Sequence, residues 1–147
     1  MHPSASWANA IVQRDRQGFE IPSEFEQIMY DYQKRYGRRV GMCSMHAAMP
    51  HAIIVDRTTM YGNPFRLKGK LVLHRKYSVY EYFLWLSRQI EDNGPVITRK
   101  QILALRNQTV LCHCNNFSSV NNAHQWCHGM ILLAAADYIH SRYGDLA

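Results

Sequence analysis

The sequence predicts an α/β fold, a single compact Rossmann-like layer fold in which helices flank a small, mainly parallel sheet. Amphipathic segments with helical spacing alternate along the chain with short apolar segments typical of strands, as in βαβ units. The apolar segments are continuous, which is expected of strands that are covered on both faces. A length of 147 residues suits one domain. We therefore expect an N-terminal arm over residues 1–20 and one α/β domain over residues 21–147.

The first half of this domain is predicted to contain one helix and two strands. Ser23 and Glu26 have the spacing of a capping box, so a helix is expected to begin there and to end before Gly37. Strands are expected next, at residues 39–45 and 52–55. The apolar residues at helical spacing, which the helix would bury, are Phe25, Ile28, Met29, Tyr32 and Tyr36.

The second half is predicted to alternate helices with one further strand. An amphipathic helix is expected at residues 78–91, because an Asn-Gly-Pro sequence follows it and stops a helix. A shorter helix, capped by a threonine, is expected at residues 98–105. A buried strand at residues 109–111 and a largely apolar helix at about residues 127–139 complete the fold.

The charge of the chain is strongly asymmetric. Seventeen basic and eleven acidic residues give a net charge of +6, and residues 1–76 carry this whole excess. Between Arg57 and Lys76 there are six basic residues and no acid. Such a segment favours an anionic ligand, for which we expect a small molecule such as a nucleotide, with nucleic acid as the alternative.

Membrane and secreted classes have no support in the sequence. The longest apolar run, at residues 130–136, is much shorter than the roughly 20 residues of a spanning helix. Residues 1–6 lack the basic and apolar regions of a signal peptide. Three of the four cysteines lie close together at residues 112–127, which favours reduced thiols or a metal site over disulfides. We expect a cytoplasmic protein without a membrane partner.

Cysteines and histidines are concentrated where one strand ends and one helix begins. Cys112 and Cys114 follow the last predicted strand, and Cys127 and His128 precede the last helix. Ligands of open α/β sheets bind beyond the carboxyl ends of strands, and a helix N-terminus lowers the pKa of a thiol. This pattern predicts Cys127 as a catalytic nucleophile and His128 as a general acid or base.

Zinc is an alternative interpretation of the same cysteines. Cys112, Cys114 and Cys127 would bind the metal with one of three histidines, namely His113, His124 or His128. The Cys-x-Cys spacing is tighter than that of common zinc knuckles, and the adjacent Cys127 and His128 are expected to point in different directions. A third interpretation is that these cysteines are small buried apolar residues, as we expect for Cys43 in its predicted strand.

A second group of candidate residues follows the second strand. Arg57 can hold a phosphate or carboxylate with two hydrogen bonds, and Asp56 can act as a catalytic acid or base or as a ribose anchor. The alternative is a surface ion pair beside a structural turn, which the Gly-Asn-Pro sequence at residues 62–64 favours. The remaining candidate ligand-binding residues are Tyr61, Asn63, Lys68, Lys70 and Gly129.

Four motifs in this order resemble the domain-of-unknown-function family numbered 4326, which occurs in bacteria and often in bacteriophages. The motifs are Val55-Asp56-Arg57, Tyr61-Gly62-Asn63-Pro64-Phe65, Leu111-Cys112-His113-Cys114 and Cys127-His128-Gly129. The resemblance covers about residues 38–140 and implies the fold and the place of the site, but no reaction. The chain differs from the family in having Tyr61 and His113 where tryptophan is usual, and a longer loop between Cys114 and Cys127.

These observations together predict a small intracellular enzyme of phage type with an anion site lined by cysteine and histidine. Its substrate would be a nucleotide, a nucleotide-derived signal or a nucleic-acid base, and its reaction hydrolysis or glycosyl transfer. The alternative is a non-catalytic phage protein that engages a host protein or nucleic acid through its basic segment. The two hypotheses differ in salt dependence, because binding to a nucleic-acid backbone weakens steeply as salt rises.

Overall fold

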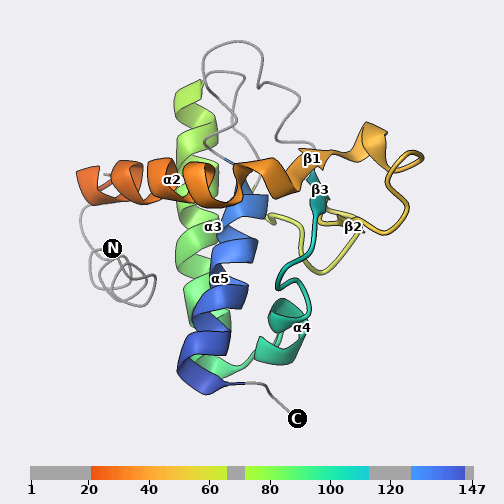
Figure 1. Ribbon diagram of the computed structural model, residues 1–147. Coiled ribbons are helices and arrows are strands. Elements are labelled where there is room, and N and C mark those ends of the chain that lie inside the picture. The colour runs from red at the N-terminus through yellow and green to blue at the C-terminus, as the bar shows by residue number, and fades with distance from the viewer. Residues whose placement is uncertain (1–20, 66–71, 113–126, 145–147) are drawn as a thin grey trace.

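A computed structural model describes residues 21–65, 72–112 and 127–144 of the protein (Figure 1). The expected N-terminal arm therefore lies outside the described residues. The helices are α2 (Ser23–Tyr36), α3 (Val72–Asp92), α4 (Arg99–Leu103) and α5 (His128–Tyr143). The strands are β1 (Val40–Met42), β2 (Ile53–Ile54) and β3 (Val110–Cys112), and the short 3₁₀ helices are η1 (Gly37–Arg39) and η2 (Cys43–Met45).

The three strands form an all-parallel sheet in the order β1-β3-β2. The central strand β3 pairs Val110 with both Val40 and Ile53, so the carboxyl ends of all three strands lie at one edge. All three residues of β3 are completely buried, as expected of a central strand covered on both faces. The predicted α/β class, with a small parallel sheet and flanking helices, is confirmed.

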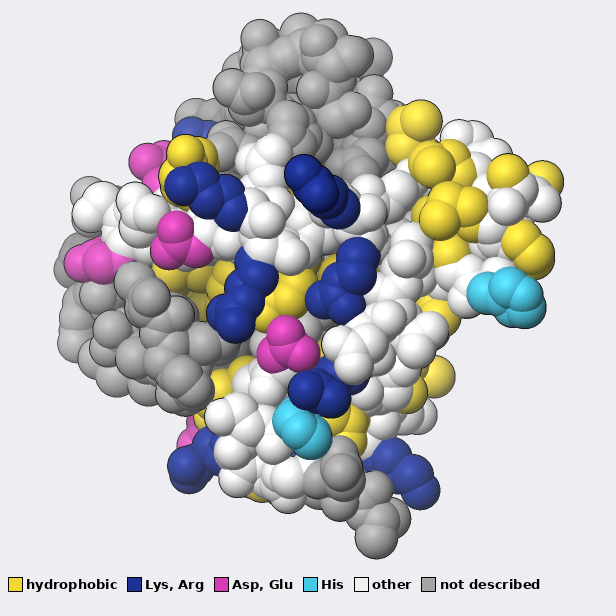
Figure 2. Space-filling model, in the orientation of Figure 1, with side chains coloured by type: hydrophobic (Ala, Val, Ile, Leu, Met, Phe, Trp, Pro, Cys, Tyr) yellow, Lys and Arg dark blue, Asp and Glu magenta, His cyan; other side chains and the backbone are white. Residues whose placement is uncertain are grey.

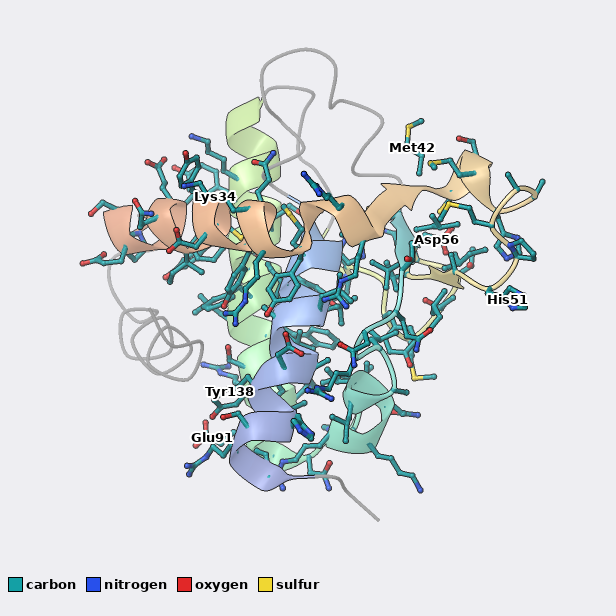
Figure 3. The ribbon with its side chains drawn as sticks, viewed as in Figure 1. Lys34, Met42, His51, Asp56, Glu91 and Tyr138 are labelled. Atoms are coloured by element: carbon teal, nitrogen blue, oxygen red, sulfur yellow. The ribbon has the colours of Figure 1, made fainter. Side chains whose placement is uncertain are left out.

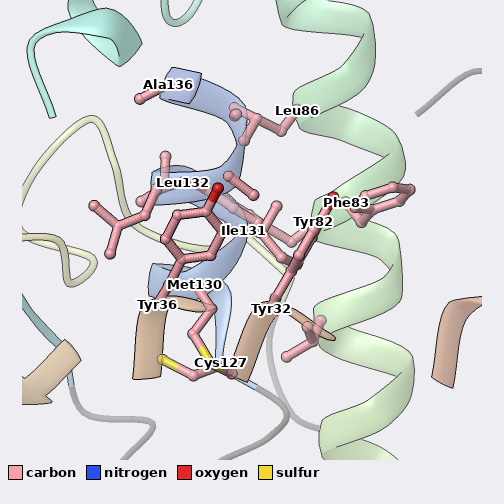
Figure 4. Packing of buried hydrophobic residues seen from close by; sticks show 14 of the residues in the cluster. Tyr32, Tyr36, Tyr82, Phe83, Leu86, Cys127, Met130, Ile131, Leu132 and Ala136 are labelled. Carbon is pink, nitrogen blue, oxygen red and sulfur yellow. The ribbon is translucent and has the colours of Figure 1, made fainter. Parts of the chain in front are cut away.

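Helix α5 lies at the centre of the helical layer. It packs against α2, α3 and α4, and Figure 1 shows α2 crossing α3 and α5, which run side by side. Ten of its sixteen residues are buried, because its sequence is apolar on nearly every side. Figure 4 shows Met130, Ile131 and Leu132 of α5 among aromatic side chains of α2 and α3. Among the helices of the described ranges, none is long and apolar enough to cross a membrane.

Several predicted boundaries are wrong for local reasons. The strand expected at residues 39–45 ends at Met42, because the chain turns into η2 and the Met45 sulfur folds back to accept the Met42 amide N–H at 3.4 Å. Helix α3 begins at Val72, well before the predicted start at residue 78, since no glycine or proline interrupts residues 72–77. The Ser23 capping box does not form, because Pro22 occupies the N-cap position.

The capping box instead forms at the start of α4. The Thr98 side chain accepts the Gln101 amide N–H, and the Gln101 side chain accepts the Thr98 amide N–H. Two donors that the helix itself cannot pair are thereby satisfied. The predicted threonine cap is confirmed, although the helix proper ends at Leu103.

The turn after β2 fixes the segment that precedes α3. The Asn63 amide donates to the Ser78 carbonyl and hydroxyl oxygens at 3.3 and 3.0 Å, and its own oxygen accepts the Phe65 amide N–H at 2.8 Å. Gly62 passes so close to the backbone of residues 56–57 that a Cβ atom there would lie 2.4 Å from the Asp56 carbonyl oxygen. The turn therefore requires glycine at position 62 because of this close approach.

The substitution Gly62→Ala should lower the free energy of unfolding by roughly 2 kcal/mol, because the opposing atoms belong to the backbone and cannot rotate away. Chemical denaturation followed by circular dichroism measures this. Gly37→Ala is the matched control, since Gly37 has helical dihedral angles and its nearest neighbour to an added Cβ is 3.4 Å away. Equal stability of the two variants would contradict the packing described for Gly62.

Candidate functional site

Two thiols and one imidazole converge at the carboxyl edge of the sheet. Cys112 is the last residue of β3, Cys127 is the N-cap of α5, and His128 is the first residue of α5. Their ligand atoms lie within 4.8 Å of one another, and all three residues are buried. The two sulfur atoms are 2.9 Å apart, against about 2.05 Å in a disulfide, and both cysteines are free thiols. We call these three residues the Cys/His centre.

The close packing of α5 on the sheet places Cys127 beside Cys112. A Cβ atom on Gly129 would lie 3.2 Å from Val110 and 3.3 Å from Val40, so the missing side chain lets the helix start against both strands. The Gly129 amide N–H donates to the Cys127 sulfur at 3.4 Å. The thiol thus satisfies one of the amides that a helix N-terminus leaves unpaired. These contacts account for Gly129 by packing and capping, and its predicted role in ligand binding stays a prediction.

The orientation of the His128 ring is fixed by two neighbours. Its Nε2 atom lies 2.6 Å from the Val55 carbonyl oxygen, and its ring meets the Tyr82 ring edge to face with centroids 5.1 Å apart. Because a carbonyl oxygen only accepts, Nε2 carries the proton and a neutral ring has its lone pair on Nδ1. A ring N–H that donates to a backbone carbonyl is the usual support of a metal-binding histidine.

Asp56 and Cys43 lie at the same edge of the sheet, after β2 and β1. The Cys43 thiol donates to Asp56 Oδ2 at 3.7 Å, and Asp56 Oδ1 accepts the Thr58 amide N–H at 2.9 Å. Figure 3 shows Asp56 near the strand ends, not far from Met42. Our expectation that Cys43 is a core residue of a strand was wrong, because β1 ends before it and the residue is only half-buried.

Arg57 lines a groove of about 380 Å³ between the turn after β2, α3 and Val96. Its Nε donates to the Asn63 carbonyl at 3.0 Å and its Nη2 to the Phe65 carbonyl at 3.5 Å. Guanidinium has five N–H groups, so three remain for an anion. Trp85 and Met60 give the same groove an apolar wall. The groove therefore places the Arg57 guanidinium group, held by two backbone carbonyls, next to an apolar surface.

The groove and the Cys/His centre are separated by Tyr82. The Tyr82 ring contacts both His128, at 5.1 Å, and Trp85, at 5.5 Å between centroids. Its hydroxyl donates to the Tyr61 carbonyl at 2.9 Å. Arg57 and Cys127, which the sequence placed around one ligand, thus belong to two adjacent parts of the site.

Tyr61 is a part of the framework of the turn. Its hydroxyl donates to the Gln101 carbonyl at 2.8 Å, which ties the turn to α4. Burial raises the pKa of the Tyr61 hydroxyl above its ordinary value, so this donor keeps its proton at neutral pH. Asn63 likewise forms hydrogen bonds with Ser78 and Phe65. Both side chains thus have structural contacts, and their predicted role in ligand binding stays a prediction.

A family model described as a domain of unknown function, DUF4326, matches residues 39–138. The chain belongs to this family. No curated protein and no solved structure matches it. The matched range of this DUF4326 chain includes Cys43, the segment at residues 55–65, the groove and the whole Cys/His centre.

Sequence reasoning named most of the side chains of this candidate site but not the contacts between them. Our expectation that Cys127 and His128 point apart was wrong: Cys127 has an extended backbone and His128 a helical one, and both side chains reach the centre. Tyr82, which orients His128, lies in the amphipathic helix predicted at residues 78–91, and no local signal in the sequence distinguishes it from the other aromatic residues of that helix. The predicted site residues Cys114, Lys68 and Lys70, like the candidate ligands His113 and His124, lie outside the described residues.

The substitution Asn63→Ala should reduce the free energy of unfolding of this DUF4326 protein by about 2 kcal/mol, because it removes the acceptor of the half-buried Phe65 amide N–H and two hydrogen bonds to Ser78. Denaturant titration measures the change. Gln27→Ala is the control, since the Gln27 amide binds only Asp31 on the exposed face of α2. If the free energy of unfolding falls by the same small amount in both variants, Asn63 does not stabilise the turn as described.

Proposed function

We propose that the protein is an enzyme that acts on a nucleotide, a nucleotide-derived signal or a nucleic-acid base, by hydrolysis or glycosyl transfer. The Cys/His centre is its reaction centre. The observation that supports this proposal is the convergence of two thiols and one imidazole at the carboxyl edge of a parallel sheet. Open α/β sheets bind their ligands at that edge, next to helix N-termini.

The donor set of the Cys/His centre suits a zinc ion. Two sulfur atoms and one imidazole nitrogen are ligands that zinc prefers, and the described residues thus supply three of the four ligands of a tetrahedral zinc site. Tetrahedral ligation would separate the two sulfurs from 2.9 Å to about 3.8 Å, which is a small displacement of each side chain. A zinc ion held here would act as a Lewis acid on the substrate.

The residues around the centre have distinct roles in this proposal. His128 would bind through Nδ1, because Nε2 is engaged with the Val55 carbonyl. Cys127 receives the Gly129 N–H, and a hydrogen bond to sulfur favours the thiolate, which is the form that binds a metal or attacks a substrate. Asp56 follows β2 at the same edge of the sheet and would serve as the acid or base for proton transfer.

The groove beside Arg57 supplies the substrate class. Two backbone carbonyls already hold the Arg57 guanidinium group in place. Binding of a phosphate or carboxylate therefore costs little further side-chain entropy. The indole of Trp85 and the Met60 side chain offer apolar contact for a ring on the same ligand. A nucleoside phosphate combines these two features, an aromatic ring and an anionic group.

The purified protein should contain about one zinc ion per chain, measured by mass spectrometry of metals. Cys127→Ser and His128→Gln should each lower the zinc content by more than half, because three ligands cannot lose one without weakening the site. Cys43→Ser is the matched control, since this thiol is not among the three converging residues. A folded protein without zinc, or equal loss in the Cys43 variant, would refute the metal site and leave Cys127 as a nucleophile.

Nucleoside monophosphates should raise the Tm of the protein, because a ligand that binds only the folded state stabilises it. Arg57→Lys keeps the positive charge but loses the planar guanidinium group that binds both carbonyls and an anion. The ligand-induced rise in Tm should therefore shrink to the value expected for roughly tenfold weaker binding. For each variant, the Tm with the ligand is compared with the Tm without it, so that a change in the stability of the unliganded protein does not affect the result. Arg88→Lys on α3 is the control. An unchanged rise in the Arg57 variant would contradict this binding site.

A further inference from the structure

Five cationic side chains lie near the carboxyl end of α2, and we call them the basic patch: Lys34, Arg35, Arg38, Arg39 and Arg106. Residues 34–39 contain four of them and no acid. Figure 2 shows dark blue side chains gathered over the end of α2 and the segment that leads into β1. The basic patch is separate from the basic run at residues 57–76, from which the sequence predicts an anionic ligand.

Buried partners hold two arginines of the basic patch in place. The guanidinium groups of Arg35 and Arg39 lie over the Tyr36 ring, 5.8 and 5.4 Å from its centroid. Tyr36 is only 1% exposed, and its hydroxyl donates to Asp137 Oδ2 at 2.7 Å. Arg106 approaches the other oxygen of Asp137 at 3.5 Å. The cations are therefore presented by a connected framework rather than by a free loop.

Little acidic charge neutralises the basic patch. Among the ion pairs of the described residues, the patch takes part only through Arg106 and Asp137. Lys76 from the basic run is different, because it pairs with Glu26 at 3.2 Å. Within the part of the chain that the structure describes, four of the five cations of the basic patch thus form no ion pair.

The arrangement of these cations favours a polyanion over a small anion or a membrane. The basic patch extends from the last turn of α2 through η1 to the turn before β3, which suits a row of phosphates. A bilayer would need an apolar face on α2, but that face is buried in the core. Next to the cations, Tyr30 is 45% exposed with Lys34 4.5 Å above its ring. Figure 3 shows Lys34 on this part of α2.

We propose that the basic patch and Tyr30 bind single-stranded nucleic acid. The lysine and arginines contact phosphates, and Tyr30 stacks on an unpaired base, which is the combination that single-strand-binding surfaces use. Arginine suits this role because its fork matches phosphate oxygens. The proposal goes beyond the enzyme reaction proposed above and does not depend on it.

Fluorescence anisotropy with a labelled single-stranded oligonucleotide, measured over a series of salt concentrations, tests this proposal. For about four phosphate contacts, log K should fall with log salt with a slope of about −3. The double variant Lys34→Gln/Arg38→Gln should bind at least tenfold more weakly and reduce the slope by roughly 1.4. Neither of these two side chains lies over Tyr36, so the fold should be retained.

The control double variant Arg88→Gln/Lys100→Gln removes the same charge from α3 and α4 and should bind nearly as well as the unaltered protein. Tyr30→Ser should weaken binding roughly fivefold or more without changing the salt slope. An equal loss of oligonucleotide affinity in both double variants would refute the basic patch as the binding surface. If a duplex or anionic vesicles bound as tightly as the single-stranded oligonucleotide, recognition of a single strand would be refuted. Cys127→Ser should leave oligonucleotide binding unchanged, which separates this test from that of the reaction centre.

Discussion

The approach of helix α5 to the central strand β3 is the contact on which the rest of the structure depends. Gly129 permits it, because a side chain at that position would press against Val110 and Val40. The same approach buries α5 between the sheet and three helices, and it places Cys127 and His128 at the end of β3. Burial of an apolar helix and assembly of the Cys/His centre are thus one event, since both require the helix to begin at this point.

Tyr82 connects the two parts of the candidate site. One ring contacts His128 and Trp85, and the hydroxyl holds the Tyr61 carbonyl, so α3 sets the relative position of the centre and the groove. Packed aromatic rings of this kind do not deform continuously, because protein interiors are close-packed. A change in the volume of Tyr82 would therefore move the His128 ring and the groove wall together. The centre and the groove are chemically distinct but mechanically joined.

The order of elements and the edge that carries the site could be predicted from sequence, and the contacts within the site could not. Asp56, Cys112 and Cys127 were located because parallel strands end at one edge and helices begin beside it. Asn63 binds Ser78, fifteen residues away, and His128 binds Val55, seventy-three residues away. Such partners depend on how distant segments pack, so the residue types alone did not reveal the structural contacts of Asn63 or the half-buried position of Cys43 after β1.

The net charge of +6 also has a different meaning once each cation is assigned its contacts. Arg57 holds two carbonyls of a turn, Arg99 donates to the Ile90 and Glu91 carbonyls at the end of α3, and Lys76 is neutralised by Glu26. Among the ion pairs of the described residues, Lys76 is the one of these three cations that has an anionic partner, so its charge contributes less to the field outside the protein. The end of α2 differs from these three, because four cations lie within six residues there and meet no acid of their own segment. The contacts of each cation in the fold, in addition to its place in the sequence, thus decide how much of its charge acts on an anion outside the protein.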